Sequence, residues 1–191
     1  MLHVSGKHPH DQHPTLFHCC DTWHVLAAAG TVIPNPPEQP ETWAALRRIR
    51  DELLEPIEQQ FGLVIVTYGF AGPELVRAVK NRARETGTLP NITPRSDQHA
   101  GHERNSAGKR ICERDGVAID LQVPGVSSLR VASWVVKHLP FDRIYLYGAD
   151  RLFRLSWAPP PLGQVIEMGT ATSGAVYPHV VQRGRREPSE T

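Results

Sequence analysis

The 191-residue chain has no excess of charge of either sign. It carries 21 Lys and Arg residues against 20 Asp and Glu residues, a formal net charge of +1. Proteins that bind nucleic acid through its phosphates usually carry a basic excess, so the composition gives no argument for nucleic-acid binding. Long hydrophobic runs are also missing: near the N-terminus the longest uncharged one is Val25–Ala29, against the roughly 20 residues that cross a bilayer. The sequence therefore predicts no nucleic-acid partner and no membrane span.

Cysteine is scarce, and its placement argues against a disulfide framework. The three cysteines are Cys19, Cys20 and Cys112, and an adjacent pair is a poor disulfide. The first residues also lack the charged region followed by an apolar stretch that marks a secretory signal. We expect a reduced, cytoplasmic protein, although release by lysis or accessory export would leave no such mark.

The composition supports one folded domain between polar ends. Hydrophobic residues make up 40% of the chain and charged residues 21%, enough apolar content for a core, while 17 prolines and 15 glycines predict many turns. Residues 1–16 contain four histidines in a polar segment and are expected to be a flexible leader. Residues 183–191 are expected to be a flexible tail. The predicted domain covers residues 17–182.

Hydrophobic periodicity predicts an α+β fold, with helices packed on a mainly antiparallel sheet. A stripe of apolar residues every three or four positions predicts a helix over residues 41–60, with a kink at Pro56. Proline and serine signals begin two further helices, near Pro73 and at Ser127 or Ser128. Short apolar, β-branched runs predict strands over residues 63–68, 117–123, 143–147, 152–157 and 164–168.

The segment from about residue 84 to residue 114 is polar, interrupted by prolines, and long for a loop in a compact domain. Loops of this length are usually functional or disordered. It contains His99 and His102, and the strand that follows carries Asp120 between Ile119 and Leu121. A carboxylate in such apolar surroundings needs a partner or a cation.

Imidazole and carboxylate groups together suit a zinc ion that keeps one position open for water. The plain alternative is a solvated loop histidine and an aspartate that caps a turn. Spacing alone leaves both interpretations open.

A motif around this aspartate resembles a known family. Gly116-x-Ala118-x-Asp120, preceded by Ser96 and His99, is similar to the signature of zinc D-alanyl-D-alanine carboxypeptidases. That superfamily also contains phage L-alanyl-D-glutamate endolysins and the hedgehog signalling domain. Segments similar to one small bacterial and phage branch extend the resemblance over about residues 17–157: they are residues 20–22, 34–37, 53–57 and 68–70.

The resemblance implies a zinc-dependent peptidase that cleaves D-Ala-D-Ala or L-Ala-D-Glu bonds in a peptidoglycan-type substrate. His99 and Asp120 would hold the zinc, with His102 as a rival ligand, and Asp150 would accept the proton of the attacking water. The substrate would lie near Ser96, Tyr68 and Arg154.

The departures from the family pattern favour a second hypothesis. The family spacing places Glu113 where the first histidine belongs, so accepting His99 requires an insertion, and the family's arginine aligns with Ala71. The position of the third zinc ligand is occupied by Arg154, whose guanidinium stays protonated and has no free lone pair. Other donors that could replace it are His179 and Cys112. Alternatively, Arg154 forms a salt bridge with Asp120, and the fold survives as a catalytically degenerate binding or structural module.

Overall fold

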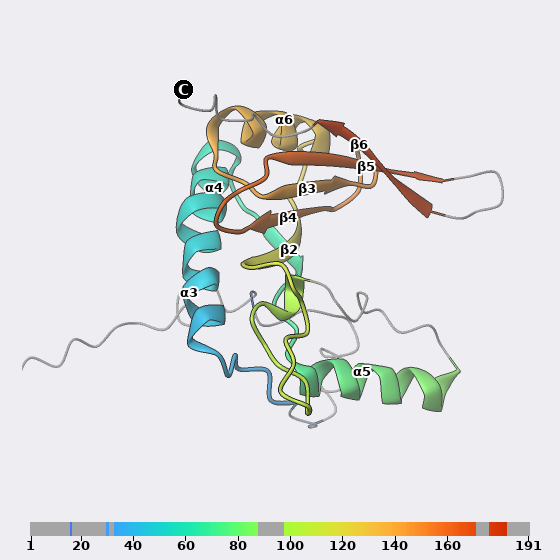
Figure 1. Ribbon diagram of the computed structural model, residues 1–191. Helices are drawn as coiled ribbons and strands as arrows, with labels where there is room; N and C mark the ends of the chain where they lie inside the picture. The colour runs from blue at the N-terminus through green and yellow to red at the C-terminus, as the bar shows by residue number, and fades with distance from the viewer. Residues whose placement is uncertain (1–15, 17–29, 31–32, 88–97, 171–175, 183–191) are drawn as a thin grey trace, which may run out of the picture.

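The computed structural model describes residue 16, residue 30 and residues 33–87, 98–170 and 176–182. Within these ranges a six-stranded sheet has the order β1-β2-β4-β3-β5-β6, and only the β3–β5 pair is parallel (Figure 1). The strands are β1 (Ile65–Tyr68), β2 (Val117–Gln122), β3 (Arg143–Leu146), β4 (Phe153–Trp157), β5 (Gln164–Thr170) and β6 (Val176–Gln182). This mixed, mostly antiparallel sheet with its helices confirms the predicted α+β class.

The first helical arm is continuous, but it is not a uniform α-helix. It consists of α3 (Pro40–Ile49), a π-helical turn η2 (Arg50–Leu54) and α4 (Glu55–Phe61). Pro56 lies at the start of α4, and the π turn directly precedes it. Because proline has no N–H to donate and its ring crowds the preceding turn, a locally widened helix accommodates it. Where the sequence predicted a kink at Pro56, the helix therefore contains a π turn directly before α4.

Alternation along the strands divides the sheet into two faces. On one face the buried side chains of β2, β3 and β4 pack with α3, η2, α4 and the helix α6 (Ser128–His138) in the main hydrophobic core. Examples are Ile119, Ile144 and Leu155, each fully buried. Successive residues of a strand point to opposite faces of the sheet. The residues next to these three in sequence therefore point to the other face.

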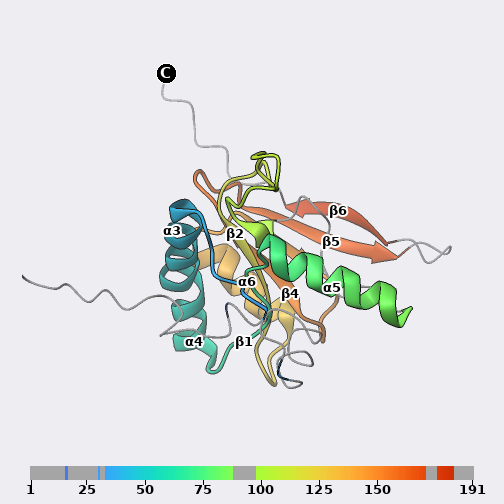
Figure 2. The same cartoon turned by 90° about the horizontal axis from the view of Figure 1, so that it is seen from below.

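That other face lies toward the helix α5 (Pro73–Thr86), the 3₁₀ turn η3 (Gln98–Ala100) and the loop of residues 101–116 that follows (Figure 2). A small second cluster joins Tyr68 of β1 to Leu75 and Val79 of α5. Gly87 ends α5 in the left-handed conformation, which glycine adopts readily at a helix end. Here α5 and the loop flank the sheet and leave room for a pocket.

Two features differ from the sequence-based expectation. Residues 176–182 form the edge strand β6, which was not predicted from the sequence, and His179 pairs with Glu167 of β5 within it. Pro178 explains why β6 was not expected. In a sequence proline usually indicates a turn, but an edge strand also tolerates it. Leu16, assigned to the flexible leader, is fully buried in the main core.

Among the described residues, no helix is long and apolar enough to cross a membrane.

Candidate functional site

The candidate site is built on a row of side chains that crosses four strands. The register places Tyr68 opposite Asp120, Asp120 opposite Arg154, and Arg154 opposite Tyr145. Directly opposed residues share one face of a sheet and lie close enough to interact. Strand pairing thus brings together four polar or aromatic side chains that are far apart in the sequence.

Asp120 and Arg154 form a shielded ion pair in the middle of this row. Nε of Arg154 donates to Oδ1 of Asp120 at 2.8 Å, and a terminal nitrogen lies 3.4 Å from Oδ2. The side chains are 11% and 14% exposed, respectively. The Arg154 guanidinium also lies over the ring of Tyr145, 5.9 Å from its centre. The salt bridge offered as an alternative in the sequence analysis is present.

His99 approaches the same carboxylate from η3. Its Nε2 lies 3.2 Å from Oδ1 of Asp120, and its Nδ1 lies 2.9 Å from the carbonyl oxygen of Gly69. The ring meets Tyr68 edge to face, and the His99 carbonyl accepts the N–H of Ala71. The imidazole is 1% exposed. His99 and Asp120 therefore do meet across the long intervening segment.

The chain directly after β1 requires a glycine because Leu16 lies against its backbone. A Cβ atom on Gly69 would overlap the carbonyl of Leu16, whose oxygen accepts the N–H of Phe70. Gly116 has a similar constraint: its φ is +84°, and a Cβ there would overlap the Trp157 carbonyl. Both glycines permit close backbone packing around the site.

The environment of Asp120 keeps its carboxyl group ionised. Burial acts to raise its pKa, but the hydrogen bonds and electrostatic interactions with His99 and Arg154 outweigh burial and lower the pKa below its ordinary value. The carboxylate is thus already neutralised by protein groups.

His102, the rival zinc ligand, faces a different neighbourhood. Its Nε2 accepts the N–H of Gly116 at 3.2 Å, and its Nδ1 lies 3.9 Å from a carboxylate oxygen of Asp115. Burial, helped by the charge of Arg110, lowers the pKa of its imidazole. This side chain anchors the loop to the start of β2.

Two predicted site residues remain, Asp150 and Ser96, and the structure describes only Asp150. Asp150 lies exposed in the turn between β3 and β4, and it is not among the residues that line the pocket beside His99. Ser96 lies outside the described residues. Their proposed roles as proton acceptor and substrate contact stay predictions.

The zinc ion that the resemblance implies would need three protein donors around one centre. In the described ranges, no group of three or more His, Cys, Asp or Glu side chains is placed to hold a metal. Both ring nitrogens of His99 point at oxygen atoms within hydrogen-bond distance, so neither is open to a metal while these contacts last. Arg154 stands where the resemblance would place the third ligand. The described residues do not fit a zinc site.

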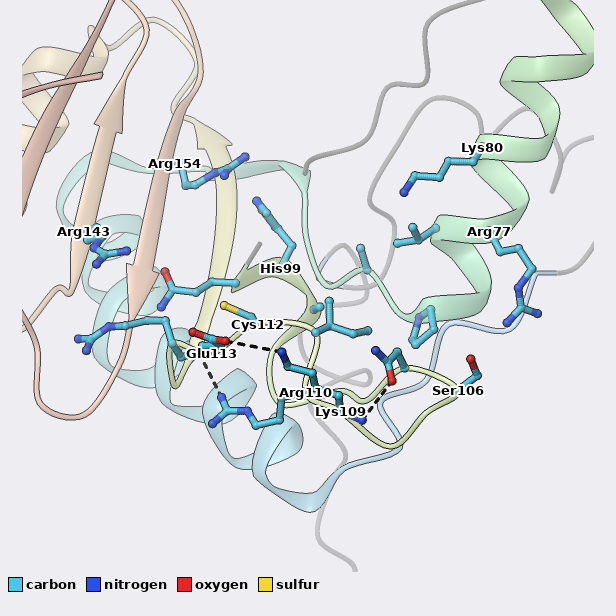
Figure 3. A pocket seen from close by; sticks show the side chains of 18 of the residues that line it. Arg77, Lys80, His99, Ser106, Lys109, Arg110, Cys112, Glu113, Arg143 and Arg154 are labelled. Carbon is cyan, nitrogen blue, oxygen red and sulfur yellow. Dashed lines mark hydrogen bonds and ion pairs between the residues drawn. The ribbon is translucent and has the colours of Figure 1, made fainter. Parts of the chain in front are cut away.

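A pocket of about 800 Å³ opens beside this cluster, between α5, the loop and strands β3 and β4 (Figure 3). His99 and Arg154 form part of its wall, and so does the buried Cys112. Most of its basic lining was not predicted from the sequence; it comes from α5, the loop and β3: Arg77, Lys80, Lys109, Arg110, Arg114 and Arg143. One signal was available, since Arg77 and Lys80 are three residues apart in a predicted helix and share a face.

Two fully buried acids, also missed, hold the loop in place. Glu103 accepts the N–H groups of Glu38 and Gln39 and the hydroxyl of Thr42, at the beginning of α3. Asp142 accepts from Arg114, from the side chain of Gln98 and from the N–H of Leu162. No local sequence pattern reveals either role, because every group that binds these two carboxylates is distant in the chain.

Comparisons with protein-family models, with curated proteins and with solved structures find no match for this chain. The likeness to zinc DD-peptidases consequently rests on the sequence motifs.

Proposed function

We propose that this chain is a non-catalytic binding domain of DD-peptidase-like design, in which an ion pair takes the place of a catalytic zinc. The observation that carries the proposal is the contact of Arg154 with Asp120 at 2.8 Å. By the sequence resemblance, these two positions belong to metal ligands. In this chain one of them is a fixed positive charge.

Electrostatics supports this assignment. A guanidinium beside the carboxylate repels a divalent cation and also satisfies the oxygens that would bind it. The pair is shielded from water, so displacing Arg154 would leave a buried charge without its partner, at a cost of about 3–5 kcal/mol. Zinc would have to overcome that cost with only two of its expected ligands.

The pocket beside the ion pair supports binding as the remaining activity. Its volume of about 800 Å³ lies in the usual range for small-molecule sites. A DD-peptidase ancestor would have used this region for a peptidoglycan-type peptide. Loss of the metal removes the chemistry and leaves the cavity.

The zinc peptidase remains a second candidate because His99 and Asp120 lie within 3.2 Å of one another. In that case both would leave their present partners to bind zinc, and the zinc would supply an acidified water for peptide hydrolysis. A third donor would have to come from outside the described residues.

Zinc titration of an Arg154→His variant separates the two candidates. Restoring a neutral donor and removing the repulsive charge should give one-to-one zinc binding in the variant and none in the parent. Arg151→His, which places the same substitution in the neighbouring exposed turn, serves as the matched control and should bind no zinc. A parent protein that binds one zinc per chain, or that hydrolyses D-Ala-D-Ala peptides only while Asp120 is intact, would overturn the proposal.

A further inference from the structure

The pocket concentrates positive charge in a chain that is nearly neutral overall. Seven of its lining residues are Lys or Arg, and one, Glu113, is acidic. Figure 3 shows that these cations line the pocket from three sides: Arg143 and Arg154 lie on the sheet, Arg77 and Lys80 on α5, and Lys109 and Arg110 on the loop. A cavity that gathers one sign of charge attracts ligands of the other.

Some of this charge is already balanced by the protein. Arg154 pairs with Asp120, Arg110 lies 2.7 Å from an oxygen of Asp115, and Arg114 binds the buried Asp142. These arginines are held in position by their carboxylates. The three arginines form part of the pocket wall and contribute to its positive electrostatic potential.

Three other cations of the pocket have no acidic partner among the described residues: Arg77, Lys80 and Arg143. An anion bound in the pocket between β3 and α5 would lie among these three cations and help to balance their charge.

The rest of the lining indicates what else the ligand carries. Apolar groups contribute part of the wall next to α5, where Ala71, Pro73 and Val76 lie together, and Ile111 adds to it from the loop. The ring of Tyr145 lies on the sheet side. A ligand that fills this volume would combine an anionic group with an organic part that contacts apolar surface.

We propose that the pocket binds a small organic diphosphate or triphosphate, with its phosphates between Arg143 and the pair Arg77 and Lys80. The proposal rests on the binding function inferred above and names its ligand class. A diphosphate places about three negative charges on adjacent groups, whereas carboxylates bring one charge each. Guanidinium groups also match phosphate oxygens in a two-pronged geometry.

Isothermal titration of the full chain with adenosine diphosphate, inorganic pyrophosphate and citrate tests the proposal. Citrate is trivalent near neutral pH and carries its charge on carboxylates alone. We expect one site for adenosine diphosphate, weaker binding of pyrophosphate because it lacks the organic part, and at least about tenfold weaker binding of citrate. Citrate binding as tight as that of pyrophosphate, or no binding of either phosphate compound, would overturn the proposal.

Charge-removing variants locate the site. Arg77→Gln/Lys80→Gln should weaken adenosine diphosphate binding by about tenfold or more, since two charge-assisted contacts are lost. Arg82→Gln/Arg84→Gln removes the same charge from exposed positions of the same helix that do not line the pocket, and it should bind like the parent. Equal weakening in both variants would mean unspecific attraction and would contradict the assigned site.

Failure of this proposal can be told apart from failure of the binding function. A zinc-free parent that binds none of the phosphate probes excludes the ligand class and leaves the non-catalytic assignment standing. A parent that contains one zinc per chain and still binds adenosine diphosphate excludes the non-catalytic assignment and leaves the ligand class standing.

Discussion

Asp120 is the residue on which both interpretations of this chain depend. In a DD-peptidase it would be a metal ligand, and here it accepts from Arg154 and lies against His99. Sequence analysis identified the residue from its apolar neighbours, because an isolated carboxylate in a strand requires a partner. The choice between metal and arginine depended on strand register, which brings position 154 opposite position 120.

The ion pair should be visible as an energetic coupling. Asp120→Asn and Arg154→Gln should each lower the free energy of unfolding by about 3 kcal/mol, because each leaves a shielded charge without its partner. The double variant should lose clearly less than the sum of the two. Urea denaturation of the four proteins measures the coupling, and additive losses would show that the two side chains do not interact.

The same carboxylate predicts a pH dependence. The pKa of Asp120 is lowered in the folded protein, so its contribution to stability is complete above the ordinary value of 3.8. The contribution is lost as the pH falls through the lower folded pKa. The stability difference between parent and Asp120→Asn, followed by denaturation from pH 6 downward, should therefore shrink in acid; a constant difference would contradict the lowered pKa.

His102 predicts a second pH effect nearer to neutrality. Its pKa is lowered from the ordinary 6.5, so its contribution is present above pH 6.5 and declines as the pH falls toward the folded value. Protonation would also remove the Nε2 acceptor of the Gly116 N–H. His102→Gln should flatten the fall in melting temperature below pH 6.5, whereas His179→Gln, at an exposed site on β6, should keep the slope of the parent.

At the scale of elements, local signals predicted some pieces well and missed others. The helix α5 follows from Pro73 at its start and Gly87 at its end, and β2 follows from its apolar, β-branched run. The π turn in the first arm and the edge strand β6 did not follow, because each depends on how a proline is accommodated by its surroundings. The contacts that fix the loop are long-range and leave no periodic pattern.

Glu103 couples the loop to the beginning of α3. Its carboxylate accepts backbone N–H groups where a helix has donors without partners and a positive dipole end. Glu103→Ala should lower the free energy of unfolding by about 2–4 kcal/mol, since the partly buried N–H groups and the buried hydroxyl of Thr42 lose their acceptor. Chemical denaturation measures the loss, and Glu113→Ala, at an exposed position of the same loop, is the control. A loss equal to that of the control would contradict the anchoring role.

At the scale of the whole molecule, the most distinctive feature is the basic pocket, which the charge composition does not indicate. A net charge of +1 gave no reason to expect a basic site, and the lining cations are spread from residue 77 to residue 154. Folding gathers them by placing α5, the loop and the exposed face of β3 and β4 around one space (Figure 3). The α+β class could be predicted from periodicity, but the pocket could not.

The central claim is that an ion pair replaces zinc in this domain. The most direct measurement is the zinc content of the full chain, purified without a tag and quantified by elemental analysis against protein concentration. The account predicts far less than one zinc per chain, and a melting temperature that does not change when a strong chelator is added. One zinc per chain, together with a fall in melting temperature on chelation that disappears in Asp120→Asn, would contradict it.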